Sequence, residues 1–377
     1  MHRFISLFFI IAGMAGAIIS EGTSTINAKY SNAYILIEAE TKSVIEEHYS
    51  DLKLNSGYLT KLMSILLIAE SIAEGEMTLS DELTASESVR NTKGSVIWLE
   101  CGDKITVEEH LKSVIIGNAN DALTVLAEKV SGDVGSFVMD MNAKAFDLGM
   151  RSTQYISPYG YYNENEYTSA HDMALVCAEL TKYDFLTPYF STWRDFVKDG
   201  KVELVSENML TRKYSRHIGF KSCHSDESGY CIAECGRDES GNTFIAVSLG
   251  ADSEDTAYDT VLSLLKNAFR KFKVTLTMFP EEMLRPLRVI GGTEAAVEIG
   301  LAAQGKVTVP KAQSELRTKV VLPEYLNAPV NIGQPIGCAA FYSGDTLVYE
   351  TEITVKRDIP SLTFGYVLKN VLLKLIE

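Results

Sequence analysis

A strongly apolar helix near the start of the chain, predicted from Leu59 to Ala73, constrains the fold more than any other segment. Its apolar residues cover most of the helix circumference: Leu59, Leu62, Met63, Leu66, Leu67 and Ile68. A helix that is apolar nearly all round belongs in the interior of a sizeable protein. The helix opens with the segment Tyr58-Leu59-Thr60-Lys61, and residues one turn apart lie on the same face. The sequence therefore predicts a buried helix with an aromatic ring beside an amine at its first turn.

The N-terminus has the composition of an export signal. The segment MHRFISLFFIIAGMAGAIIS has a short basic start, a largely apolar run and small residues towards its end. This order predicts a secretory signal peptide over residues 1–28, with cleavage between Ala17 and Ala28, and therefore an exported mature chain. A transmembrane anchor is the alternative, which the small-residue end and the lack of a flanking positive cluster disfavour.

Length and charge limit the classes of function. A chain of 377 residues has room for two domains after the signal peptide. The formal net charge of −15 argues against nucleic acid or anionic lipid as the main partner, because both are polyanions. The charge does not identify a substrate.

The region from residue 29 to residue 271 is predicted to be an α+β domain. Strands are expected at 33–38, 43–47, 219–223, 230–235 and 244–249. Helices are expected at 59–73, 106–116, 136–148 and 257–269, with two more beginning at 120 and 169, and Thr106 with Glu109 forms a capping box. Sheet residues at both ends of a helical block indicate that the first and last strands share one antiparallel sheet.

Residues 272–358 are predicted to be a small all-β domain. Short β-rich runs recur at 274–277, 287–290, 306–309, 319–322, 330–332, 338–342 and 346–355, punctuated by Gly, Pro and Asn. This spacing is typical of a β-sandwich. Residues 359–377 read as an amphipathic tail helix with Leu368, Val371, Leu372 and Leu375 on one face, which either lies in a membrane interface or docks on the β domain.

The six cysteines have no spacing that defines a metal site or a disulfide framework. Cys101, Cys177 and Cys338 are far apart in apolar surroundings and are expected to be buried thiols. Cys223 and Cys231 flank a hairpin-like turn, where either a cross-strand bridge or, with His217 and His224, a zinc site is conceivable. The favoured interpretation is that these cysteines are small strand residues.

Three segments together resemble the active-site motifs of a known family: Tyr58-x-x-Lys61, Asn118-Ala-Asn120 and Lys221-Ser222-Cys223. In order and spacing they are similar to the Ser-x-x-Lys, Ser-x-Asn and Lys-Thr-Gly motifs of the D-alanyl-D-alanine carboxypeptidases, the low-molecular-mass penicillin-binding proteins. Further similar phrases are Ala33–Ala39, Met141–Met150, Ser157–Gly160, Tyr167–Ala174 and Gly229–Cys231. The resemblance implies a β-lactamase/transpeptidase-like domain followed by a β domain. A class A β-lactamase is the nearest rival, and the extra β domain speaks against it.

The resemblance also implies roles for these positions. Tyr58 stands at the nucleophile position, Lys61 at the base position and Asn118 at the proton-shuttling serine of the second motif. Asn120, Lys221 and Ser222 are the expected substrate-binding residues, with Lys221 facing a substrate carboxylate. Cys223 replaces the glycine beside which the substrate lies, and no metal or cofactor is implied. The blander interpretations are a packing role for Tyr58, a helix cap for Asn118 and a solitary strand lysine for Lys221.

The departures from the motifs predict a non-catalytic protein. A phenol oxygen lies on the order of 3–4 Å farther from the backbone than a serine hydroxyl, and Asn118 cannot relay a proton. The favoured hypothesis is an exported carboxypeptidase-like protein of peptidoglycan metabolism that binds a stem peptide or another cell-wall protein. The alternatives are an active carboxypeptidase with a non-standard nucleophile, and an envelope interaction protein that works through its β domain and tail.

Overall fold

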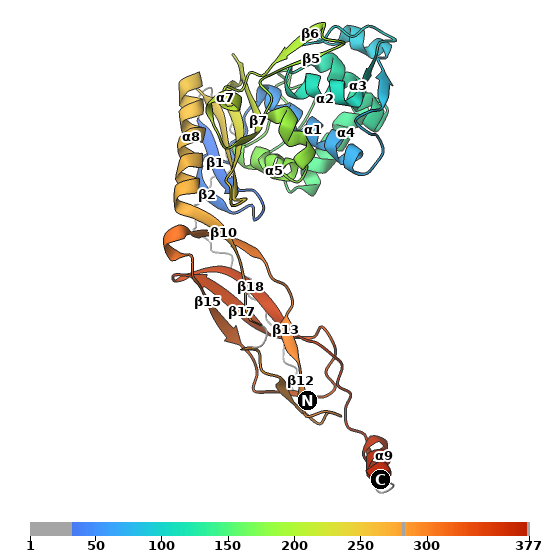
Figure 1. Cartoon of the computed structure of the whole chain (residues 1–377), viewed down its shortest axis with the longest axis vertical. Helices are drawn as coiled ribbons and strands as arrows, with labels where there is room; N and C mark the ends of the chain where they lie inside the picture. Colours follow the sequence, from blue (N-terminus) through green and yellow to red (C-terminus); the bar gives the residue numbers. More distant parts are fainter. Residues whose placement is uncertain (1–31, 281–282, 375–377) are drawn as a thin grey trace.

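The computed structural model describes residues 32–280 and 283–374 of the chain. The molecule is elongated, with a unit of helices and sheet at one end, a β unit in the middle and a short helix at the far end (Figure 1). The expected signal peptide, residues 1–28, lies outside the described residues. None of the described helices has the length and apolar character that a bilayer span requires.

A five-stranded antiparallel sheet with the strand order β2-β1-β9-β8-β7 forms the frame of the first unit. β1 pairs with β9 in a register that sets Ala33 opposite Leu249 and Glu38 opposite Phe244. The prediction that the first and last strands of this unit share one sheet is therefore confirmed. The strands are β1 (Ala33–Glu38), β2 (Val44–His48), β7 (His217–Ser225), β8 (Gly229–Arg237) and β9 (Thr243–Ala251).

The two faces of this sheet pack against different helices, because successive side chains of a strand point to opposite faces. Leu36 of β1 packs in a cluster with α8 (Glu254–Lys271). Ile35 and Ile37 of the same strand belong to the main core, which α1 (Lys61–Ala73) and α5 (Ala170–Leu180) share. Helix α8 therefore covers one face of the sheet, and the helical block with α1 and α5 covers the other.

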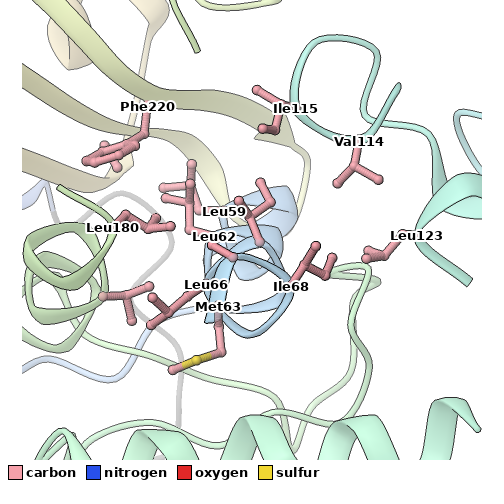
Figure 2. Packing of buried hydrophobic residues seen from close by; sticks show 14 of the residues in the cluster. Leu59, Leu62, Met63, Leu66, Ile68, Val114, Ile115, Leu123, Leu180 and Phe220 are labelled. Carbon is pink, nitrogen blue, oxygen red and sulfur yellow. The ribbon is translucent and has the colours of Figure 1, made fainter. Parts of the chain in front are cut away.

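Helix α1 runs through the middle of the main core. Figure 2 shows Leu62 and Leu66 of this helix among Leu123, Leu180 and Phe220, which come from α3, α5 and β7. Leu62 and Leu66 are fully buried. Complete burial of one such side chain stabilises the folded state by roughly 1.5–3 kcal/mol. The prediction that this helix is interior is confirmed.

The other elements of the first unit surround α1. The longer helices begin and end within about three residues of the predicted positions. The antiparallel pair β3–β4 and the short hairpin β5–β6 are not anticipated from the sequence. The elements are α2 (Val107–Ile115), α3 (Asn120–Ser131), α4 (Val134–Asp147), α6 (Thr187–Phe190), α7 (Leu210–Lys213), η1 (Gly57–Thr60), η2 (Glu87–Asn91), η3 (Asp184–Leu186), β3 (Glu82–Thr84), β4 (Lys104–Thr106), β5 (Arg194–Val197) and β6 (Val202–Val205).

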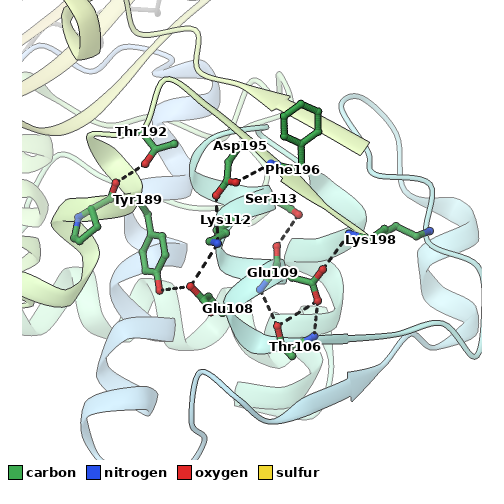
Figure 3. A network of polar contacts seen from close by, with 11 residues as sticks. Thr106, Glu108, Glu109, Lys112, Ser113, Tyr189, Thr192, Asp195, Phe196 and Lys198 are labelled. Atoms are coloured by element: carbon green, nitrogen blue, oxygen red, sulfur yellow. Dashed lines mark hydrogen bonds and ion pairs between the residues drawn. The ribbon is translucent and has the colours of Figure 1, made fainter. Parts of the chain in front are cut away.

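A polar network joins α2 to the β5–β6 hairpin (Figure 3). The Thr106 hydroxyl accepts a hydrogen bond from the Glu109 N–H at 3.2 Å, and the Glu109 carboxylate accepts one from the Thr106 N–H at 3.3 Å. The predicted capping box is therefore confirmed. Glu109 also accepts a hydrogen bond from the N–H of Lys198, in the turn of the hairpin, at 3.0 Å. The Glu109 carboxylate thus accepts hydrogen bonds from backbone N–H groups at the start of α2 and in the β5–β6 turn.

The β unit is a sandwich with its own core. The three-stranded sheet β12-β11-β16 and the four-stranded sheet β13-β18-β17-β15 share buried residues such as Val289, Val297, Phe341 and Ile353. The predicted run at 330–332 contributes only an isolated bridge between Val330 and Ile359. The elements are β10 (Phe272–Leu276), β11 (Leu287–Ile290), β12 (Ala296–Val297), β13 (Ile299–Leu301), β14 (Lys306–Pro310), η5 (Lys311–Gln313), β15 (Leu316–Val321), β16 (Tyr325–Asn327), β17 (Pro335–Ser343) and β18 (Thr346–Val355).

The tail helix is shorter than the sequence pattern indicates. Helix α9 spans Phe364–Lys374, because Ile359 is held in a β-bridge to Val330 and residues before Phe364 complete the β unit. Residues 362–369 are exposed, and α9 lies beyond the end of the β unit (Figure 1). Docking of the described part of the tail on the β domain is therefore wrong.

All six cysteines carry free thiols. Cys177 is buried as expected, but Cys101 is exposed and Cys338 is partly exposed. The expectation of three buried thiols is therefore wrong for Cys101 and Cys338. Cys101 lies in a turn and Cys338 lies on a strand of the thin β unit, so the apolar neighbours of each in sequence do not enclose it in space.

Candidate functional site

The site is built around η1, the single turn that precedes α1. Gly57 has a φ of +53°, and a Cβ atom there would lie 3.1 Å from the Cys223 sulfur. A Cβ atom at Gly160 would lie 2.1 Å from the Gly57 carbonyl oxygen. Strand β7 and the loop at residue 160 therefore approach η1 so closely that only glycine fits at both positions.

A buried carboxylate fixes the far side of η1. Glu166 accepts hydrogen bonds from the Thr60 hydroxyl at 2.9 Å and from the N–H groups of Ile156 and Ser157 at 3.1 and 3.0 Å. Burial raises the pKa of Glu166, and these three donors oppose that rise. Glu166 therefore connects η1 to residues 156–157 through hydrogen bonds. No local sequence pattern identifies this role of Glu166.

Tyr58 and Lys61 are neighbours, as the helical spacing predicts. The Lys61 Nζ atom lies 4.7 Å from the centroid of the Tyr58 ring, within the range of a cation–π contact. Lys61 is only 1% exposed. Its Nζ donates a hydrogen bond to the Asn118 carbonyl oxygen at 2.9 Å. The aromatic ring therefore covers the amine.

The Lys61 amine is easily deprotonated. Burial, followed by the charge of Lys221, lowers the pKa of Lys61 from its ordinary 10.5 to about 7. Both effects disfavour the charged form, because a buried ammonium loses hydration and a second cation repels it. A large share of the Lys61 side chains is therefore uncharged at neutral pH.

Asn118 and Asn120 carry two unsatisfied amide oxygens. Within the described residues, neither the Oδ1 atom of Asn118 nor that of Asn120 has a hydrogen-bond partner, and both side chains are buried. The Asn120 Nδ2 group donates to the Lys93 carbonyl oxygen at 2.7 Å and to the Tyr161 hydroxyl at 3.1 Å. Asn118 has a φ of +57°, and the N-cap of α3 is Ala119. The interpretation of Asn118 as a helix cap is therefore wrong.

Lys221 and Ser222 make contacts with different elements. The Lys221 Nζ donates to the carbonyl oxygens of Ile115 at 2.6 Å and Val114 at 3.3 Å, at the end of α2. Burial lowers the pKa of Lys221 to about 8. Ser222, one residue on, accepts a hydrogen bond from the Tyr258 hydroxyl of α8 at 3.1 Å. Lys221 therefore contacts the end of α2, whereas Ser222 contacts α8.

A cavity of about 280 Å³ adjoins the Ser222 end of the site. Its lining includes Ser222, Cys223, Tyr258 and the carboxylate of Glu207. Glu207 is exposed, and its negative charge raises the pKa values of both Lys61 and Lys221 against the effect of burial. The sequence carries no signal for this role, since Glu207 lies in a short connection between β6 and α7.

Cys223 fills the space between β7 and η1. Its thiol donates a hydrogen bond to the Ser56 carbonyl oxygen at 3.2 Å, and the side chain is 6% exposed. A glycine there would leave this space open. The thiol therefore narrows the approach along the strand.

Neither of the two serines near Tyr58 in the sequence takes the place of a nucleophile at the start of α1. The Ser56 hydroxyl is buried and lies 3.3 Å from that of Thr60, and the Ser64 hydroxyl donates to the Pro158 carbonyl oxygen at 2.9 Å from a fully buried position. Among the described residues no group of three or more His, Cys, Asp or Glu side chains is arranged to hold a metal ion. His217, considered above for zinc, is hydrogen-bonded to Glu234 at 2.6 Å and to the Phe190 carbonyl oxygen.

The five-stranded sheet, the interior helix α1 and the two lysines at its edge define a protein with the penicillin-binding-protein type of transpeptidase fold. A family model described as D-alanyl-D-alanine carboxypeptidase matches residues 20–253, more than half of the chain, and the C-terminal domain of penicillin-binding protein 5 matches residues 275–361. The chain belongs to the D-alanyl-D-alanine carboxypeptidase family.

Known relatives span nearly the whole chain. The D-alanyl-D-alanine carboxypeptidase DacF of Bacillus subtilis (strain 168) is 29% identical over 348 residues, which cover 91% of this chain and 89% of DacF. DacC of Escherichia coli (strain K12) is 26% identical and covers 94% of this chain and 90% of DacC. The crystal structure of penicillin binding protein 5 from Haemophilus influenzae shares the fold, with a TM-score of 0.79 and 23% identity over 90% of this chain and 100% of that structure.

Proposed function

We propose that this protein is exported, acts in peptidoglycan metabolism and binds a peptidoglycan stem peptide, or another cell-wall protein, without cleaving it. Membership of the carboxypeptidase family and the names of its relatives support the ligand class and an extracytoplasmic, cell-envelope location. The signal-peptide pattern of residues 1–28 supports export.

The observation that carries the non-catalytic part is the Tyr58 ring over the Lys61 amine at 4.7 Å. An acyl-transfer site tolerates a misplacement of about 1 Å before large losses of rate. The phenol oxygen is several times that distance from the place of a serine hydroxyl. Loss of the nucleophile alone lowers turnover by roughly 10⁶-fold in a related acyl-transfer site.

Peptide binding is supported by the two free amide oxygens. Asn118 and Asn120 present buried acceptors that have no partner within the described residues. A buried acceptor that remains unsatisfied costs about 1–3 kcal/mol. A ligand rich in N–H donors, such as a peptide backbone, would remove that cost.

Labelling with fluorescent penicillin tests the proposal. The purified mature chain is expected to remain unlabelled after long incubation with excess reagent, and to release no D-alanine from a pentapeptide that ends in D-Ala-D-Ala. The Tyr58→Ser variant is expected to stay poorly labelled, because Asn118 cannot relay a proton and Cys223 narrows the cleft. Stable covalent labelling of the wild-type chain would refute the non-catalytic part.

Hydrolysis with Tyr58 itself as the nucleophile is the second candidate, favoured by the pKa of Lys61 near 7. Its signature would be release of D-alanine that Tyr58→Phe abolishes. The Phe variant is a matched control because it removes only the phenol oxygen. Equal rates for the two proteins would exclude this candidate.

The third candidate is an envelope interaction protein that works through its β domain and tail. The exposed Phe364 (83%), Val367 (45%) and Leu368 (47%) favour it, and they also support peripheral membrane contact through residues 359–377. Co-sedimentation of the mature chain with lipid vesicles, beside a chain that ends at residue 358, tests the contact. Equal recovery of both chains would exclude it.

A further inference from the structure

Two cysteines of the site sheet face each other across neighbouring strands. Cys223 of β7 and Cys231 of β8 are directly opposed in the antiparallel register. Directly opposed residues have Cα atoms about 4.5 or 5.5 Å apart and side chains on the same face. A disulfide requires Cα atoms roughly 4.4–6.8 Å apart. The backbone therefore already holds this pair at a distance that a disulfide permits.

The two thiols are in contact within the protein interior. Cys223 is 6% exposed and Cys231 is 0% exposed. Contact with Cys231, together with burial, raises the pKa of Cys223, while contact with Cys223 lowers the pKa of Cys231.

The pair is connected to the ligand site through one sulfur atom. The Cys223 thiol donates to the Ser56 carbonyl oxygen at 3.2 Å and lies 3.1 Å from the position of a Cβ atom at Gly57. Ser56 and Gly57 lead directly into Tyr58. The reduced sulfur thus supports the start of η1 against β7.

We propose that Cys223 and Cys231 form a disulfide when the chain folds in an oxidising compartment, and that this bond regulates how η1 and Tyr58 are held against β7. The two thiols lose two protons and two electrons, and a low-molecular-mass disulfide accepts them and becomes two thiols. Oxidation removes the S–H proton, so the Ser56 carbonyl oxygen loses one of its two donors and keeps the Leu59 N–H. An effect on peptide affinity rests on the proposed function, whereas disulfide formation does not.

Mass spectrometry tests the bond. The mature chain is refolded with oxidised glutathione or with dithiothreitol, free thiols are blocked with N-ethylmaleimide, and the protein is digested after glutamate. Glu227 separates Cys223 from Cys231, and Glu234 separates Cys231 from Cys235. Fragments that contain Cys223 and Cys231 are expected to be linked only in the oxidised sample. Cys235 is an internal control because it opposes Gly219 and is expected to be alkylated.

Full alkylation of Cys223 and Cys231 after oxidative refolding would overturn the proposal, as would a bond from either residue to Cys235. This measurement needs no ligand. It is therefore independent of whether the protein binds peptidoglycan peptides.

Hydrogen exchange tests the effect on the site. The Leu59 N–H donates to the Ser56 carbonyl oxygen. Exchange of the amides of residues 57–60 is expected to be roughly fivefold faster in the oxidised protein, the change that corresponds to one net hydrogen bond of about 1 kcal/mol. Dithiothreitol should reverse the change in the wild type. The Cys235→Ala variant should behave like the wild type, and the Cys231→Ala variant should not respond.

Peptide titration of the same two forms separates the two proposals. If the oxidised and reduced proteins differ roughly fivefold in affinity for a D-Ala-D-Ala pentapeptide, the result supports both peptide binding and its regulation by the Cys223–Cys231 bond. A change in exchange without any peptide binding keeps the redox pair and refutes the proposed function. Identical exchange and identical affinity in both forms would refute the regulatory part even if the bond forms.

Discussion

The two lysines of the site are buried cations whose hydrogen-bond partners are backbone carbonyl oxygens. Lys61 donates to Asn118, and Lys221 donates to Val114 and Ile115. Their pKa values fall to about 7 and about 8, chiefly because of burial. The folded state therefore carries a cost for keeping them protonated at neutral pH, and that cost has a measurable pH dependence.

We expect the free energy of unfolding to rise with pH between about pH 7 and pH 10. Lys61 has a folded pKa near 7 and an ordinary value of 10.5, so the unfolded chain binds more protons in this window. The contribution of Lys61 approaches about 1.4 kcal/mol per pH unit and vanishes below the folded pKa, where both states are protonated. Urea unfolding of Lys61→Met should show a slope smaller by that amount, whereas the exposed Lys53→Met should keep the wild-type slope. Equal slopes for wild type and Lys61→Met would contradict this account.

Asn118→Gly is expected to weaken peptide binding by about fivefold to tenfold. The change removes the free Oδ1 acceptor but keeps the φ of +57°, which glycine adopts without strain. The backbone carbonyl that holds Lys61 also remains. Calorimetric titration with a D-Ala-D-Ala pentapeptide measures the effect, and loss of one net hydrogen bond corresponds to about 1 kcal/mol. An unchanged affinity would show that Asn118 does not contact the ligand.

At the scale of elements, the position of the site depends on helices and hairpins that are joined by single polar side chains. Glu109 caps α2 and also holds the β5–β6 hairpin through the Lys198 N–H (Figure 3). The end of α2 supplies the carbonyl oxygens that bind Lys221. Loss of the cap at the start of α2 is therefore expected to shift the carbonyl oxygens that bind Lys221.

Glu109→Ala is expected to lower the free energy of unfolding by about 1–2 kcal/mol, since it breaks the capping box and leaves the Lys198 N–H without its carboxylate partner. The matched control is Glu108→Ala. Glu108 is partly exposed and contacts Lys112 at 3.5 Å and the Tyr189 hydroxyl at 3.2 Å. Surface pairs of this kind contribute about 0–1 kcal/mol. Urea unfolding of the two variants in parallel measures the difference. A larger loss of unfolding free energy for Glu108→Ala than for Glu109→Ala would refute the structural role given to Glu109.

At the scale of the whole molecule, the two units have separate cores and are joined by polar contacts and one packed aromatic ring. The main core and the cluster under α8 lie in the first unit, and the third cluster lies in the β unit. Polar contacts link Thr41 with Thr308 at 3.0 Å, Glu40 with Lys306 at 2.7 Å, Asn242 with Val274 at 2.8 Å and Phe269 with Lys311 at 2.8 Å. The Phe272 ring of β10 packs against the cluster under α8. Such an interface couples two domains weakly.

A chain of residues 29–271 is therefore expected to fold alone, with a Tm within about 5 °C of the corresponding transition of the mature protein. Differential scanning calorimetry of the mature chain should show two transitions, of which the truncated chain keeps one. A single transition in the mature chain, or a truncated chain without cooperative unfolding, would show that the β unit is required for the first unit to fold.

Periodicity determined the elements of this protein because it is a local property of the chain. The run from Leu59 to Ala73 predicts an interior helix, and the short, largely apolar runs around residues 35 and 246 predict buried strands. The motif spacing also placed Tyr58, Asn118 and Lys221 as one candidate site. The sequence also limited the catalytic chemistry, because a phenol stands where the family motif has a small hydroxyl.

Only the tertiary structure decided which atoms of those residues interact. It binds Lys61 to the carbonyl of Asn118 and not to its side chain, turns Ser222 towards Tyr258, and brings the charge of Glu207 near both lysines. Contacts between distant segments depend on strand register and helix packing, and a shift of one residue in β7 would move Ser222 to the opposite face of the sheet. No local pattern in the chain encodes that choice, because packing of the whole core determines it.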